Sequence, residues 1–127
     1  MTDFSKVGKF SNGVEVLNCT PHIITFRDGE AEIVVEPCGA LVMAKALETP
    51  AGTHGAAALV KTVFQTTPQG EAELVEIECM AAGVLAVGSI ISAQAYPGRV
   101  VGMTSAPGFE RVPPDQKRMS TQKFTIF

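Results

Sequence analysis

The sequence contains no tryptophan and only one tyrosine, so the core must be built from smaller side chains. Seven phenylalanines are the other aromatic residues, and 46% of the 127 residues are hydrophobic. Charged residues make up 18%, below the about 25% of an ordinary soluble domain. This composition excludes a disordered chain, and the length predicts a single domain over residues 1–127.

The chain also lacks blocks of like charge and long apolar runs. Its formal net charge is −3, and its basic residues are dispersed apart from the pair Lys117 and Arg118, which argues against binding to duplex nucleic acid. The longest apolar stretch, residues 80–95, contains Gly and Ser and is shorter than the ~20 residues of a spanning helix, so no membrane partner is expected. No basic head followed by an apolar run marks a secretory leader, which predicts a cytoplasmic protein.

The three cysteines, Cys19, Cys38 and Cys79, form no Cys-x-x-Cys pair of the kind that zinc and thiol-redox sites use. We expect all three to be reduced and mostly buried. The two histidines, His22 and His54, lack a third partner for a metal site. We therefore expect no metal and no cofactor.

Turn signals divide the chain into short segments rich in β-branched residues. Residues 14–18, 22–27 and 30–36 are predicted strands, the last two joined across Asp28-Gly29, and together they suggest a β-meander. Residues 57–66 and 71–79 are predicted to pair across the turn at 68–70.

Residues 40–47 fit either a helix or a strand. We expect a flexible N-terminus over about residues 1–12, a loop-rich segment over about 105–123, and a terminal strand or docked tail over 123–127.

The most informative stretch is a buried strand, a short helix and a second strand. Residues 84–87 predict the first strand, and Ser89 is a plausible N-cap for a helix over 90–96. Pro97 stops this helix, and the next strand begins near Val100. The predicted fold is a small, β-rich α+β (mixed α/β) domain with about five to seven strands and one short helix after Gly88. Such a sheet leaves edges and a face exposed, so we expect a homo-oligomer.

Two segments carry a resemblance. Residues 17–26 contain Asn18-Cys19-Thr20-Pro21-His22, and residues 87–99 contain a strand followed by Ser-x-x-x-Ala-x-Ala-x-Pro. Both segments resemble small uncharacterised proteins of phage and bacterial genomes that begin with Asn-x-Thr-Pro-His and a strand. The resemblance implies a phage or prophage context, hence a host cytoplasm, and no particular activity.

The first group of candidate ligand-binding residues is Asn18, Thr20 and His22. The side chains of Asn18 and Thr20 suit a tight turn, because they can bond to nearby backbone groups. His22 has three interpretations: it locks the turn by bonding to a carbonyl, it contacts a ligand, or it acts as a catalytic acid or base.

The second group is Gly88, Ser89 and Arg99. Gly88 and Ser89 can offer N–H groups and a hydroxyl to an anion at a strand-to-helix junction, or Ser89 simply caps its helix. Arg99 can grip a phosphate or carboxylate, or it is an ordinary solvated charge.

Two charged segments complete the candidates. The four acidic side chains of Glu71, Glu73, Glu76 and Glu78 are either a solvated sheet face or an acidic site. The run from Arg111 to Arg118 is either an exposed loop or a contact for a partner.

Three functions fit these observations. The leading hypothesis is a non-catalytic, phage-type accessory or counter-defence protein that holds a small anionic or nucleotide-like ligand, because donors at turns and caps are present and no catalytic signature is visible. The second is a virion or assembly component that contacts other virion proteins or its own copies through sheet edges and the tail 124–127. The third is a small hydrolase that uses His22.

Overall fold

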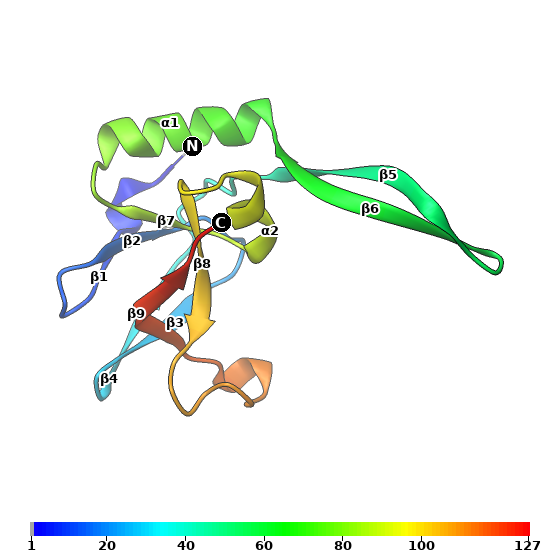
Figure 1. Ribbon diagram of the computed structural model, residues 1–127. Helices are drawn as coiled ribbons and strands as arrows, with labels where there is room; N and C mark the ends of the chain where they lie inside the picture. Colours follow the sequence, from blue (N-terminus) through cyan, green and yellow to red (C-terminus); the bar gives the residue numbers. More distant parts are fainter. Residues whose placement is uncertain (1) are drawn as a thin grey trace.

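A computed structural model describes residues 2–127. These residues form nine β-strands, two α-helices and two 3-10 turns, which confirms the predicted small β-rich domain (Figure 1). In chain order the elements are η1 (Phe4–Lys6), β1 (Gly8–Lys9), β2 (Glu15–Asn18), β3 (Ile24–Asp28), β4 (Ala31–Val35), β5 (Ala44–His54), β6 (Ala57–Thr66), α1 (Pro68–Met80), β7 (Leu85–Val87), α2 (Ile90–Ala95), β8 (Val100–Ser105), η2 (Pro114–Gln116) and β9 (Met119–Thr125).

Seven strands form one mixed sheet in the order β1-β2-β7-β8-β9-β3-β4. The centre is parallel, because β2 pairs with β7 and β7 pairs with β8 in the same direction. The sheet curls until its two edge strands, β1 and β4, lie next to each other. Gly8 permits this approach, since a Cβ atom there would stand 2.6 Å from a methyl carbon of Val35. The result is a nearly closed sheet with little free edge.

Consecutive residues of the central strands face two different cores. Leu17, Ala86 and Val100 lie in one register and pack toward the helices, in a cluster that includes Leu74 and Tyr96. Their chain neighbours Val16, Val87 and Val101 point to the opposite face, into a cluster around Phe10 and Phe26. Burial on both faces explains why these strands are short continuous apolar runs instead of alternating ones.

The strand–helix–strand prediction at the centre of the chain is confirmed. Ser89 is the N-cap of α2, and its hydroxyl oxygen accepts a hydrogen bond from the Ser92 N–H at 3.1 Å. The preceding Gly88 is required by packing, because a Cβ there would lie 2.8 Å from Val100 and 3.2 Å from Ser92. The helix therefore sits tightly against the sheet between its two parallel strands.

The prediction of a strand over residues 71–79 is wrong, because this segment belongs to helix α1. Thr67 is its N-cap, with its hydroxyl oxygen accepting from the Gly70 N–H at 3.0 Å, and Pro68 occupies the first turn. Leu74 and Ile77 are buried on one side at helical spacing. The glutamates of this segment therefore lie on a helix and are not a solvated sheet face. Neither helix among residues 2–127 has the length and apolarity needed to cross a bilayer.

Residues 57–66 form a strand as predicted, but β6 pairs with β5 and not with 71–79. The end of the ambiguous segment 40–47 enters β5, and His54 is the last residue of the same strand. The register of β5 shifts between Pro50 and Thr53, where the strand bulges. In Figure 1 this hairpin projects away from the rest of the molecule, and we call it the arm (residues 44–66).

The N-terminal third is not a meander. The hairpin between β3 and β4 is confirmed, and its two-residue turn includes Gly29 at φ 64°. The β2 strand, however, pairs with β1 and β7, while β3 pairs with β4 and β9. A continuous meander would have joined β2 to β3; the Asn18–His22 turn carries the chain across to the other part of the sheet instead.

Candidate functional site

Asn18 organises the turn that follows β2. Its side chain is fully buried, and its amide nitrogen donates to the carbonyl oxygens of His22, at 2.6 Å, and Val35, at 3.1 Å. Its amide oxygen accepts from the backbone N–H of Thr20 at 2.9 Å and from the Thr20 hydroxyl at 2.6 Å. All the hydrogen-bonding capacity of this amide is therefore used inside the protein. Asn18 holds the site in shape and offers nothing to a ligand.

Thr20 and His22 complete the turn with backbone contacts. The Thr20 hydroxyl also lies 3.0 Å from the His22 carbonyl oxygen, and the His22 N–H donates to that hydroxyl at 3.3 Å. Within residues 2–127 the His22 imidazole makes no hydrogen bond, so it does not lock the turn through a carbonyl as one interpretation expected. The turn therefore presents an exposed imidazole that no hydrogen-bonding group of residues 2–127 engages.

This imidazole lines a cavity of about 660 Å³. The cavity wall comes from the turn and the start of β3, from the N-terminus of α2, from β8, and from the loop that leads into β9. The lining residues are 20–25, Ser89, Met103, 114–115 and 117–119. Drug-sized ligands occupy cavities of about 300–1,000 Å³, so this volume accommodates a small molecule.

The cavity lining combines apolar and charged residues. Ile24, Met103 and Met119 are apolar, while Lys117, Arg118 and Asp115 contribute two cations and one carboxylate. Arg118 is partly engaged, since its Nε donates to Glu32 at 2.6 Å and one terminal nitrogen donates to the Lys117 carbonyl oxygen at 2.8 Å. Lys117 is exposed and forms no ion pair with any residue from 2 to 127. It is the cation best placed to meet a bound anion.

Gly88 and Ser89 contribute differently from each other. The Gly88 N–H donates to the Val101 carbonyl oxygen at 3.0 Å, so the sheet uses this group and it is not available to an anion. The Ser89 hydroxyl caps α2 and also lies 3.2 Å from the Ser92 hydroxyl oxygen. Ser89 nevertheless remains exposed and borders the cavity.

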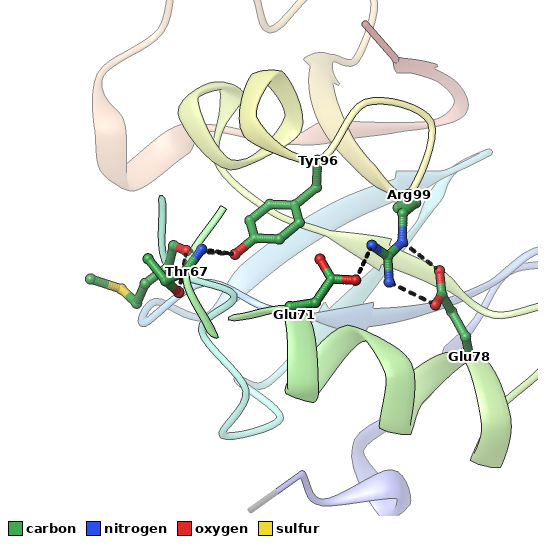
Figure 2. A network of polar contacts seen from close by, with 6 residues as sticks. Thr67, Glu71, Glu78, Tyr96 and Arg99 are labelled. Carbon is green, nitrogen blue, oxygen red and sulfur yellow. Dashed lines mark hydrogen bonds and ion pairs between the residues drawn. The ribbon is translucent and has the colours of Figure 1, made fainter. Parts of the chain in front are cut away.

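Arg99 lies outside the cavity lining, in an ion-pair cluster with α1 (Figure 2). Its guanidinium donates to both carboxylate oxygens of Glu78, at 3.0 and 2.9 Å, and to Glu71 at 2.6 Å. These hydrogen bonds, that of Glu78 first, raise the pKa of Arg99, and the same contact lowers the pKa of Glu78. Two carboxylates thus neutralise the cation that the sequence offered as an anion-binding group.

The cysteines separate into a buried pair and an exposed thiol. The sulfur atoms of Cys19 and Cys38 lie 3.9 Å apart in the helix-side core, and Cys79 is exposed on α1. The hydrogen bond with Cys38, together with burial, raises the pKa of the Cys19 thiol. Across residues 2–127 no three His, Cys, Asp or Glu side chains gather in a way that could hold a metal ion.

Of the six residues singled out from the sequence, Thr20, His22 and Ser89 line the cavity, Asn18 and Gly88 support its walls, and Arg99 lies elsewhere. Sequence reasoning missed the cationic side of the cavity. Lys117 and Arg118 were visible as the basic pair of a loop, but nothing local showed that the loop folds back beside β3.

Comparison with protein-family models, with curated proteins and with solved structures finds no match for this chain. The chemistry of the cavity must therefore be judged from its own residues. Hydroxyls, an imidazole and an ammonium group are donors suited to an anion, and the apolar wall suits a carbon-containing remainder.

Proposed function

We propose that this protein is a non-catalytic binding protein that holds a small anionic, nucleotide-like ligand in the cavity between the Asn18–His22 turn and the loop before β9. The observation that carries the proposal is the convergence of Thr20, His22, Ser89 and Lys117 on one cavity of about 660 Å³. These groups come from three separate parts of the chain and meet only in the fold.

The position of the cavity supports the same proposal. The strands β2 and β7 are parallel neighbours, and the chain leaves their carboxyl ends at Asn18 and Val87. The segments that follow, 20–22 and Ser89, both line the cavity. In sheets with parallel strands, ligands commonly bind just outside the carboxyl ends, because loops from adjacent strands converge there.

The biological setting belongs to the proposal as well. The resemblance of residues 17–26 and 87–99 to small phage and bacterial proteins suggests a phage-encoded accessory protein. We propose that it works in the host cytoplasm, where binding a nucleotide-like molecule would remove it from a host process such as defence.

The binding proposal is tested by thermal unfolding in the presence of adenosine monophosphate, pyrophosphate and, as an uncharged counterpart, adenosine. A ligand that binds only the folded state stabilises it by RT ln(1 + [L]/Kd), about 2.7 kcal/mol at a hundredfold excess over Kd. We expect the phosphorylated probes to raise the melting temperature and adenosine to leave it unchanged. Lys117→Ala and His22→Ala should weaken this response at least tenfold in apparent Kd.

The matched control is Lys123→Ala, which removes an exposed lysine that does not line the cavity. It should retain the wild-type response. Equal loss in Lys117→Ala and Lys123→Ala would show that charge alone attracts the probes. The proposal fails if no anionic probe stabilises the wild-type protein and mass spectrometry of the freshly purified protein finds no bound small molecule.

A second candidate function is an assembly or virion component, and the projecting arm is the observation that favours it. The exposed side chains of Ile126 and Phe127 at the C-terminus offer a further apolar contact. The hydrolase alternative with His22 has one discriminating outcome in the same experiment: a probe recovered as products, with turnover lost in His22→Ala and folding retained.

A further inference from the structure

The arm is the part of the molecule least explained by a binding cavity. Its strands β5 and β6 pair only with each other, and in Figure 1 they extend alone away from the body. A two-stranded hairpin with no other support is marginally stable in water. Only the base of the arm is supported by the body, where Ala44 and Phe64 pack against the helix-side core and α2 contacts both strands. The outer part of this twisted ribbon would gain stability from a surface that packs on it.

The arm leaves the body in a fixed direction, because its two ends are tied together. The Tyr96 hydroxyl donates to the Met43 carbonyl oxygen at 2.8 Å and accepts from the Thr67 N–H at 3.0 Å (Figure 2). Met43 directly precedes β5, and Thr67 directly follows β6. The Thr67 hydroxyl adds a bond to the same Met43 oxygen at 3.1 Å. Such a root positions the arm in advance for a partner.

Both faces of the arm expose apolar side chains. Leu47 and Val63 are cross-strand partners on one face, which also carries Leu59, while Val60 lies on the opposite face. These four side chains are between 40% and 48% exposed. A hairpin that belonged to a monomer would turn one apolar face to the core and one polar face to water.

The apolar surface continues past the root of the arm onto the body. Met43 and Ile91 are exposed there, and α2 contacts both arm strands. The β6 edge is regular over its whole length, whereas β5 is interrupted by Pro50 and a bulge, which are features that discourage edge pairing. One side of the arm is therefore open to a further strand.

Area favours a second copy of this chain as the occupant. A ribbon of about ten residues and two strands is ~33 Å long and ~10 Å wide, so one face offers roughly 330 Å². Stable interfaces bury about 800 Å² on each partner. In a twofold dimer each copy gives an arm and receives one, which doubles the area per copy, and the root patch adds to it. An unrelated partner contacting one arm face gains no such doubling.

The distribution of charge between the arm and the body also favours a second copy of this chain as the partner. The arm carries Lys45, Lys61 and Glu48, whereas the whole chain has a net charge of −3. The body, which is the rest of the chain outside residues 44–66, is therefore the acidic part of the molecule. A second copy supplies an acidic body for a weakly basic arm.

We propose that the arm is a reciprocal interface between two copies of this chain, each arm packing its apolar side chains against the other copy. This inference does not rest on the cavity or its ligand. It places the self-association surface on residues 44–66 and the adjoining root, and not on the edges of the curled sheet or on the C-terminal tail.

The test is the native mass and the dimer dissociation constant, measured by light scattering and sedimentation on the full chain. Val63→Asp puts a charge on the arm, and Val34→Asp makes the same change at a strand residue of the body; the two valines are 44% and 59% exposed. The wild type should have at least twice the 13.4 kDa chain mass. Val63→Asp should raise the dissociation constant at least tenfold, and Val34→Asp should leave it unchanged.

Far-ultraviolet circular dichroism and melting of each variant establish that the body remains folded, and Leu47→Asp provides a second variant on the same arm face. The proposal is overturned if the wild type is monomeric at about 100 µM. It is equally overturned if both arm variants keep the wild-type mass and dissociation constant, or if Val34→Asp dissociates the protein as strongly as Val63→Asp.

Discussion

Asn18 shows how much structure one buried polar residue can hold in place. Its side chain connects the end of β2 to β4, through Val35, and to the turn that carries His22. From the sequence, Asn18 was a candidate for ligand contact within a tight turn, in which its side chain was also expected to bond to nearby backbone groups. Local patterns correctly predicted the turn, but they could not show that Val35, from another strand, consumes the remaining donor.

Asn18→Ala leaves the carbonyl oxygens of Val35 and His22 without that donor. We expect a loss of about 2–4 kcal/mol in the free energy of unfolding, because a buried polar group left unpaired costs about 1–3 kcal/mol. Urea denaturation followed by circular dichroism measures this loss. Asn12→Ala is the control: it removes an exposed asparagine whose side chain donates to the Thr121 carbonyl oxygen and accepts from the Val14 N–H, and it should cost about 1 kcal/mol or less because its groups can bond to water instead. Equal losses would contradict the role given to Asn18.

Among the elements, helix α1 was predicted as a strand although the sequence contains signals for a helix. The acidic residues at 71, 73, 76 and 78 gave an imperfect alternation that resembled a strand. Thr67-Pro68 was a helix-start signal, since Thr is a favoured N-cap and Pro a favoured first residue. Leu74 and Ile77 at helical spacing supported it. The error came from giving an imperfect alternation more weight than the helix-start signal and the helical spacing.

The pairing of β5 with β6 was missed for a related reason. Every strand in a sheet pairs with a neighbouring strand. Because residues 71–79 were assigned to a strand, they supplied a partner for residues 57–66 across the intervening turn, and residues 44–54 were not considered as the partner. Pro50 and the glycines around it are typical of a loop, because proline and glycine are depleted in strand interiors. In the structure these residues lie at a bulge and at the tip of an exposed hairpin, where both residue types are tolerated.

The contact of Arg99 with α1 gives the stability of this helix a pH dependence. Arg99 lowers the pKa of Glu78 in the folded state. The contact therefore stabilises the folded protein at pH values above the unfolded pKa of a glutamate, about 4.3. This stabilisation disappears as the pH falls through the lower pKa of the folded state. The difference in unfolding free energy between wild type and Glu78→Gln should be greatest near neutral pH, at less than about 1 kcal/mol for an exposed pair, and should shrink below about pH 4.

Urea denaturation at several pH values measures this difference. Glu76→Gln is the matched control, because it removes an exposed carboxylate of the same helix that forms no ion pair with a described residue. If both variants differ from wild type by the same amount at every pH, the contact does not link Arg99 to Glu78 in solution.

At the scale of the whole molecule, the order of strands in the sheet could not be predicted from local sequence patterns. Strands at 14–18, 22–27, 30–36, 57–66 and 84–87 were predicted close to their observed places. The parallel pairing of β2 with β7 and of β3 with β9 joins segments far apart in sequence. Hydrophobic runs indicate that these strands are buried, but they do not indicate which strands pair with each other. The cavity depends on those pairings, which is why only its Thr20, His22 and Ser89 side was predictable.

The distribution of thiols over the folded molecule yields a whole-chain prediction. Cys79 is exposed, whereas Cys19 and Cys38 are 2% and 1% exposed in the core. A maleimide at pH 7 should add one label to the native protein within minutes and three after unfolding, because buried thiols react only when the fold opens. Intact mass spectrometry counts the labels. Cys79→Ser should take up none in the native state, and rapid double labelling of wild type would contradict the described core.

The root of the arm has one further consequence. Since the ends of residues 44–66 are held side by side by Tyr96, the arm is joined to the body like an insertion between two adjacent positions. Neither the seven-stranded sheet nor the cavity lining contains an arm residue, and only the base of the arm, at Ala44 and Phe64, packs against the core of the body. Evolution or an engineer can thus lengthen, shorten or exchange the outer part of the arm in one step. Such a change would alter which partner the arm binds and leave the cavity unchanged.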